Sequence, residues 1–175
     1  MGYDSRRHIK VTLNEKEKET CRAILQAIAE MGDQSIEDAN IATHIKTTAK
    51  YGVTIADKVL ACIKDLEEND LLEYVQGRGY GVYDDGNIEY DEDLTHNYDD
   101  GGLETMIAYA LEPGHFGYSK FVGEDGEQWG YCFGRTSENK VYMIPMHAET
   151  VFYIEDRPEN PIPKEIKKWA EEEHI

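Results

Sequence analysis

The sequence predicts an α+β protein: a helical N-terminal region, an acidic connector, and a small antiparallel sheet followed by a C-terminal helix. Two observations support this prediction. Apolar residues recur at spacings of three and four between residues 12 and 66, which is typical of helices packed on a core. Short runs of β-branched and aromatic residues, separated by turn residues, occupy 116–154 and indicate strands. The sequence therefore predicts three segments: 1–83, 84–102 and 103–175.

Three helices are predicted in the first segment, each beginning at a capping-box pattern in which Ser or Thr precedes an acidic residue by three positions. These patterns are Thr12–Glu15, Ser35–Asp38 and Thr54–Asp57. Gly32 should end the first helix, and the second should end near Tyr51-Gly52. The expected inward-facing residues are Cys21, Ile24, Leu25, Ile28 and Met31, then Ile36, Ala39, Ala42 and Ile45, then Ile55, Val59, Cys62 or Ile63, and Leu66.

A β-hairpin is predicted after the third helix. Its strands are Leu71–Val75 and Tyr80–Tyr83, and the glycines of Gln76–Gly79 supply the positive φ that a tight turn requires. The first segment thus contains three helices followed by a hairpin.

The remaining residues form an acidic connector and a β-rich segment. DDGNIEYDEDLTHNYDDGG contains eight acids and no Lys or Arg, which is typical of a solvated linker. A short helix is expected over Leu103–Leu111. A last helix should begin at Pro163, with Ile162, Ile166 and Trp169 as its apolar stripe. The expected strands between them are Phe116–Val122, Gln128–Phe133, Val141–Met146 and Val151–Ile154, with turns at Glu124–Gly126, Thr136–Asn139 and His147–Glu149.

The stretch VLACIKDLEENDLLEYVQGRGYGVY resembles the recognition helix and wing of the winged helix-turn-helix superfamily. The resemblance covers residues 12–83, less than half of the chain. It implies a third helix in the DNA major groove and a wing on the backbone or minor groove. Asn69-Asp70 departs from the usual glycine turn, and the Thr47–Val53 connection is long. The residues that carry the resemblance are Leu66, Glu67, Leu71, Leu72, Arg78 and Gly79.

Charge distribution also favours DNA contact by this region. The chain has a net charge of −18, but residues 1–83 contain 11 Lys and Arg against 14 acids, whereas residues 84–175 contain 7 against 22. Between Ala39 and Lys64 the only acid is Asp57, against four lysines. The expected contacts with double-stranded DNA are Lys46, Lys50, Thr54, Lys58, Ala61, Lys64 and Arg78, with Arg6, Arg7 and Lys10 as a basic N-terminal arm. These features predict a transcriptional regulator whose β-rich segment serves homodimerisation or partner binding.

Three other interpretations remain open. Lysines on a solvated helix face are common, and winged helices also act as protein-docking scaffolds. Clustered acids can instead imitate a phosphate backbone and inhibit a nucleic-acid-binding protein, as in virus-encoded antidefence inhibitors; surface acid can also be an adaptation to a salty cytoplasm. The connector acids proposed for such partner binding are Asp91, Glu92, Asp93, Asp99 and Asp100.

Few residues suggest catalysis or metal binding. The three cysteines form no CxxC pair, which fits a reducing compartment. No apolar run is long enough for a membrane span or a signal peptide, so a cytoplasmic protein is expected. Cys132 and His147 lie on neighbouring predicted strands, where a buried cysteine and a turn histidine are more ordinary than a catalytic pair. The acidic connector lacks the EF-hand spacing, and no phosphate-binding glycine loop is present. We expect no enzyme activity, cofactor or metal.

Overall fold

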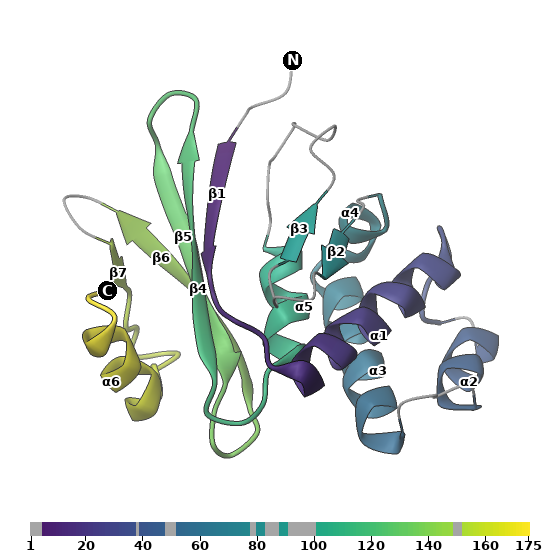
Figure 1. The fold of residues 1–175 in the computed structure, drawn as a ribbon. Coiled ribbons are helices and arrows are strands. Elements are labelled where there is room, and N and C mark those ends of the chain that lie inside the picture. The colour runs from purple at the N-terminus through teal and green to yellow at the C-terminus, as the bar shows by residue number, and fades with distance from the viewer. Residues whose placement is uncertain are drawn as a thin grey trace. The chain divides into compact units, whose positions relative to one another are not determined.

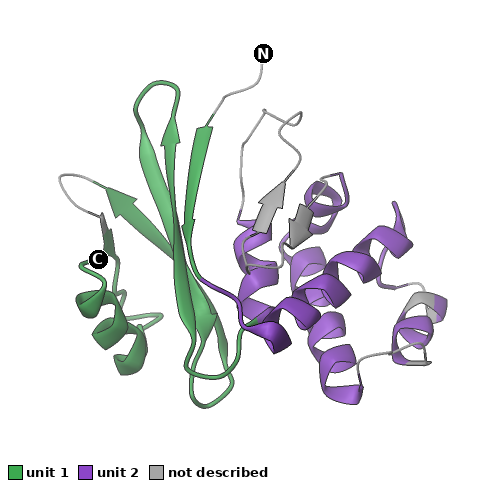
Figure 2. Cartoon of the chain, in the orientation of Figure 1, with its two compact units in different colours: residues 1–11, 95–98, 111–175 green, residues 12–94, 99–110 purple. Residues whose placement is uncertain are grey.

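The computed structural model has an α+β fold that divides into two compact units (Figures 1 and 2). The helical unit comprises residues 12–94 and 99–110, and the sheet unit comprises 1–11, 95–98 and 111–175. The units therefore alternate along the sequence, whereas the sequence predicted contiguous segments. The structure describes residues 5–37, 39–47, 52–77, 80–82, 88–90, 101–148 and 152–175.

Helix α1, Glu15–Met31, begins at a capping box centred on Asn14. The Asn14 side chain accepts a hydrogen bond from the Glu17 amide, and the Glu17 carboxylate accepts one from the Asn14 amide, both at 2.9 Å. The predicted box at Thr12–Glu15 is therefore wrong by two residues, because Asn14 takes the cap position. The predicted end at Gly32 is confirmed, with φ of 58°. Among the described helices, none is long and apolar enough to span a bilayer.

Helices α2, Ala39–Thr47, and α3, Val53–Glu68, follow and contact each other. The second helix was predicted to open at Ser35, but residues 35–37 lie outside any helix and α2 begins at Ala39, so this prediction is wrong. Asp38 lies outside the described residues. Helix α3 begins one residue before Thr54, behind Gly52, which has no side chain to form a cap. The predicted Thr54–Asp57 box is therefore wrong. The predicted inward face of α3 is confirmed by the buried Ile55, Val59, Cys62, Ile63 and Leu66.

A short helix, α4 (Leu72–Gln76), occupies the place of the first predicted hairpin strand. Asp70 adopts a left-handed φ of 57°, and the Leu71 amide donates to the Leu66 carbonyl at 2.7 Å. This Schellman-type end reverses the chain after α3, so that Leu72 and Val75 are buried on one side of a helical turn. The prediction of a Leu71–Val75 strand is wrong.

The hairpin is formed instead by β2, Tyr80–Val82, and β3, Ile88–Tyr90, which pair antiparallel. Strand β3 lies inside the segment predicted as a solvated linker, so the linker prediction is wrong for these residues. Helix α5, Gly102–Ala110, confirms the helix predicted at Leu103–Leu111 and is almost entirely buried within the helical unit.

The sheet unit contains five antiparallel strands in the order β1-β4-β5-β6-β7. The strands are β1 Ser5–Lys10, β4 Phe116–Gly123, β5 Gln128–Arg135, β6 Val141–Ala148 and β7 Phe152–Ile154. The last four confirm the predicted meander. The basic N-terminal arm is wrong: Arg6, Arg7 and Lys10 belong to β1, which pairs with β4 along its whole length.

Helix α6, Lys164–Glu172, covers one face of the sheet (Figure 1). Ile162 and Ile166 are buried against Phe116, Tyr118, Cys132 and Met146, as the predicted apolar stripe requires. Trp169 is half-buried, with its ring centroid 5.7 Å from that of Phe116 and 6.3 Å from that of Tyr118. Aromatic and aliphatic contacts therefore hold α6 on this face.

Candidate functional site

The residues predicted to contact DNA lie on α2 and α3 where the structure describes them. Lys46 is exposed on α2. On α3, Thr54, Ala61 and Lys64 are exposed and Lys58 is half-buried. Lys50 and Arg78 lie outside the described residues.

The outward side of α3 is a stripe with mixed charge. The stripe consists of Thr54, Asp57, Ala61, Lys64 and Glu68, which recur at spacings of three and four and are all exposed. The Lys64 ammonium lies 3.6 Å from the Glu68 carboxylate, one helical turn further along. The positive charge of Lys64 is therefore partly compensated within the helix, by an exposed pair of small energetic value.

The first turn of α3 is the most exposed apolar part of this region. The Val53 side chain is 78% exposed at the start of the helix, although valine is usually buried. Thr54 beside it is also exposed. This turn therefore presents a methyl-bearing surface and a hydroxyl that the core of the unit does not use.

Asp91, Glu92, Asp93, Asp99 and Asp100 all lie outside the described residues. The nearest described part of the acidic segment is the backbone of β3.

The candidate thiol–imidazole pair does not form. Cys132 pairs in register with Ile144, whereas His147 pairs with Trp129, so the two side chains project from opposite faces of the sheet. Burial raises the pKa of Cys132 to about 12, and the same effect raises the pKa of Cys21 to about 12. Both thiols are therefore neutral core groups at physiological pH.

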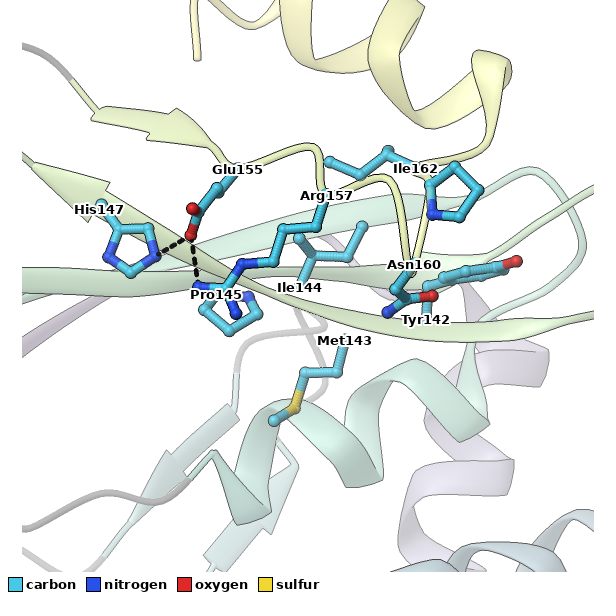
Figure 3. A pocket seen from close by; sticks show the side chains of 10 residues that line it. Tyr142, Met143, Ile144, Pro145, His147, Glu155, Arg157, Asn160 and Ile162 are labelled. Carbon is cyan, nitrogen blue, oxygen red and sulfur yellow. Dashed lines mark hydrogen bonds and ion pairs between the residues drawn. The ribbon is translucent and has the colours of Figure 1, made fainter.

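A pocket of about 220 Å³ lies between β6 and residues 155–162, in the sheet unit (Figure 3). Glu155 is its central charged group: its carboxylate is 2.7 Å from the Arg157 guanidinium and 3.4 Å from His147 Nε2. The hydrogen bond from Arg157 holds the pKa of Glu155 below its usual value. The pocket is lined by Tyr142, Met143, Ile144, Pro145, His147, Glu155, Arg157, Asn160, Pro161 and Ile162.

The lining combines charged and apolar side chains. All ten lining residues are described, and none is a Ser, Thr, Cys or Lys. Glu155 holds the guanidinium and the imidazole at one end, with apolar side chains beside them. Among the described residues, no group of three or more His, Cys, Asp or Glu side chains could hold a metal ion.

Sequence reasoning missed two features of the sheet unit. The pocket joins β6 to residues 155–162, and no local motif marks that proximity. The sequence also did not predict the strand Ser5–Lys10. Its inward-facing and outward-facing residues alternate, but all except Ile9 are polar or charged, so no alternation of apolar and polar residues marks the strand. The only available signal was the placing of Ile9 between the polar residues His8 and Lys10.

Comparisons with protein-family models, with curated proteins and with solved structures found no match to this chain.

Proposed function

We propose that the protein is a non-enzymatic, DNA-associated regulator whose helical unit contacts double-stranded DNA through α3, in the manner of a winged helix. The observation that carries the proposal is the exposed first turn of α3, with Val53 and Thr54. In helix-turn-helix proteins the N-terminal residues of the recognition helix contact base edges. A valine side chain suits the thymine methyl group, and a threonine hydroxyl suits a base edge or a phosphate.

The arrangement of the helical unit supports this role. Helix α3 contacts both α1 and α2 through its apolar face, which leaves the opposite stripe available to a ligand. The hairpin β2–β3 follows α4 in the chain, and in this proposal it would serve as the wing. Lys46 and Lys64 are the exposed described cations that would neutralise phosphates. The sheet unit then serves homodimerisation or partner binding, which light scattering of the purified protein tests.

The acids on α3 set the expected strength of binding. Asp57 and Glu68 share the exposed stripe with Lys64 and repel phosphate. Binding should therefore rest on few phosphate contacts, with a slope of log affinity against log salt of about −0.9 for each.

The test is fluorescence anisotropy with labelled duplex DNA at 50–200 mM salt. Lys46→Gln and Lys64→Gln should each weaken binding and reduce the salt slope by about 0.9. Glu68→Gln releases Lys64 from its ion pair and should tighten binding, a result that misfolding cannot imitate. Lys168→Gln, which removes an exposed lysine of α6, is the charge-matched control and should change nothing.

Val53→Ala tests base contact separately from phosphate contact. It should reduce the preference among duplex sequences and leave the salt slope unchanged. No binding at 50 mM salt to any duplex, including DNA from around the protein's own gene, would overturn the proposal.

A second candidate is an acidic docking or DNA-mimic protein, favoured by one observation. Strand β3 lies within the acidic segment and pairs with β2, so part of this segment belongs to a folded hairpin. Carboxylates presented from a folded surface can occupy the DNA site of a basic protein. The test neutralises Asp91, Glu92, Asp93, Asp99 and Asp100 to Asn or Gln. Loss of a captured DNA-binding protein, with duplex affinity unchanged, would favour this second function.

A further inference from the structure

Strands β1 and β4 form a positively charged pair in an acidic protein. Together they contain Arg6, Arg7, Lys10 and Lys120 and no Asp or Glu. The whole chain has 18 Lys and Arg against 36 Asp and Glu, so the other segments contain 14 against 36. The 14 residues of these two strands, with four cations and no acid, therefore differ in charge from the rest of the chain.

Most of this charge projects from one face of the pair. Arg6, His8 and Lys10 alternate along β1 and are exposed, whereas Arg7 projects to the opposite face, with its guanidinium 4.9 Å from the Phe121 ring centroid. His8 pairs in register with Lys120 of β4. We call Arg6, His8, Lys10 and Lys120 the basic row.

Tyr118 orders two members of the basic row. The Lys10 ammonium lies 5.7 Å from the Tyr118 ring centroid and the Lys120 ammonium lies 5.1 Å from it. Trp169 of α6 packs against the same ring. The two ammonium groups are therefore placed over a ring that the core holds in position.

We propose that the basic row binds the phosphodiester backbone of single-stranded nucleic acid, without regard to base sequence. Arg6 and Lys10 lie four residues apart on β1, about 13 Å, which is close to two phosphate repeats of an extended single strand. Lys120 lies on β4 beside His8, between them. This spacing is the reason for choosing an extended single strand as the ligand. Arg6 supplies a planar guanidinium that can donate two parallel hydrogen bonds to a phosphate.

The neighbouring carboxylates limit the affinity of the basic row. Glu173 lies 2.6 Å from the Lys10 ammonium, and Glu124 lines the same shallow hollow as Arg6. Val122, also exposed beside Arg6, offers no ring on which a base could stack. Contacts should therefore be to phosphates rather than to bases.

Protection of an edge strand is the competing explanation of these charges. Charged side chains on an edge discourage pairing with another sheet edge. Lysine is favoured in that role, so protection explains a cation on the edge strand β1. It does not explain Lys120, because β4 is paired on both sides.

The test is anisotropy with a labelled 20-nucleotide oligothymidylate. With three phosphate contacts, by Arg6, Lys10 and Lys120, log affinity should fall with log salt at a slope of about −2, roughly 20-fold between 50 and 200 mM salt. The double variant Arg6→Gln/Lys120→Gln should lose about two thirds of that slope. Lys168→Gln on α6 is again the charge-matched control and should change nothing.

Glu173→Gln is the most decisive variant. It removes the ion pair of Lys10 and should raise the affinity for the oligothymidylate about two- to fivefold. A misfolded variant would not bind more tightly. Oligoadenylate of the same length should bind equally. Unchanged affinity in both the double variant and Glu173→Gln would overturn the proposal. Equal competition by poly-glutamate at the same charge concentration would also overturn it, by assigning the surface to acidic proteins.

This inference stands apart from duplex binding by α3. Lys64→Gln should lower duplex affinity only, and Arg6→Gln/Lys120→Gln should lower single-strand affinity only. Either activity can therefore fail while the other is observed.

Discussion

The two units differ in whether the sequence pattern of each element reveals its place in the fold. In the helical unit, α1, α3 and α4 lie within residues 15–76 and α5 packs on α1 and α3 from residues 102–110, but the apolar residues of each helix mark it as a helix. In the sheet unit, β4 to β7 follow one another closely, but β1 pairs with a strand more than 100 residues away. The first unit therefore depends on local patterns that are visible in the sequence, and the second depends on one long-range pairing that is not.

The largest expected effect on stability comes from a substitution at Gly130, where β4 and β5 approach closely. A Cβ on Gly130 would lie 2.1 Å from the backbone oxygen of Ser119 on β4. Gly130→Ala should therefore force β4 and β5 apart and lower the free energy of unfolding by about 3 kcal/mol, measured by urea denaturation. Gly77→Ala in the helical unit is the control. Its Cβ would lie 3.7 Å from the nearest atom, so its stability should stay level or rise. Equal losses for the two variants would show that steric approach is not the cause.

Core packing in the helical unit should give a comparable but smaller loss. Leu66 is fully buried in α3, and Leu66→Ala should lower the free energy of unfolding by about 2–3 kcal/mol through lost apolar contact and a residual cavity. Circular dichroism at 222 nm follows this unfolding. The same deletion at the exposed Val53 should change stability by less than about 0.5 kcal/mol. A large loss at Val53 would mean that its side chain is buried in solution, for example by self-association.

The N-cap of α1 gives a smaller expected effect and tests which residue caps the helix. Asn14→Ala removes the acceptor of the Glu17 amide and should lower the free energy of unfolding by about 1 kcal/mol. Thr12→Ala, which removes the residue that the sequence pattern favoured, should have no measurable effect. If Thr12→Ala proved the more costly change, α1 would begin two residues earlier in solution.

A pH-dependent contact in the sheet unit gives the smallest expected effect. Asp156 accepts hydrogen bonds from the Lys167 ammonium and, at 2.9 Å, from the Ile162 amide. These contacts hold the pKa of Asp156 below its usual value of 3.8. Since the folded pKa is depressed, the contribution to stability is present above about pH 4 and is lost as the pH falls through the folded value.

The measurement for this contact is the urea midpoint from pH 6 to pH 2. Asp156→Asn should remove part of the decline seen in the wild type. Glu171→Gln, which neutralises an exposed acid of α6, is the matched comparison and should leave the decline unchanged. Equal declines in wild type and Asp156→Asn would exclude a contribution from this carboxylate.

Apolar periodicity predicted most of the helices correctly, and runs of β-branched and aromatic residues between turn residues predicted the β4–β7 meander, because each pattern involves neighbouring residues. It failed at Leu71–Val75, where a short apolar run suits a strand or a helix equally. The run forms a helix because Asp70 before it adopts a left-handed conformation and reverses the chain. A left-handed aspartate is uncommon, so the sequence alone favours glycine at such a position.

The candidate sites were less predictable than the fold. Exposure of Thr54, Ala61 and Lys64 follows directly from the helical period, and the structure agrees. Pairing of Lys64 with Glu68 also follows from their spacing of four residues. The basic row could not be predicted, because Lys120 meets His8 only through strand pairing across the chain.

The pairing of β1 with β4 also imposes an order on biosynthesis. Ser5–Lys10 leaves the ribosome long before Phe116–Gly123 is made, and at about 5–20 residues per second the delay is roughly 5–20 s. During this interval the nascent chain carries an unpaired strand while the helices α1 to α4 are already complete. Arg6, Arg7, His8 and Lys10 make that waiting segment hydrophilic and poorly suited to premature association with other nascent chains. Ser5–Lys10 can therefore take its place in the sheet only after β4 has been made.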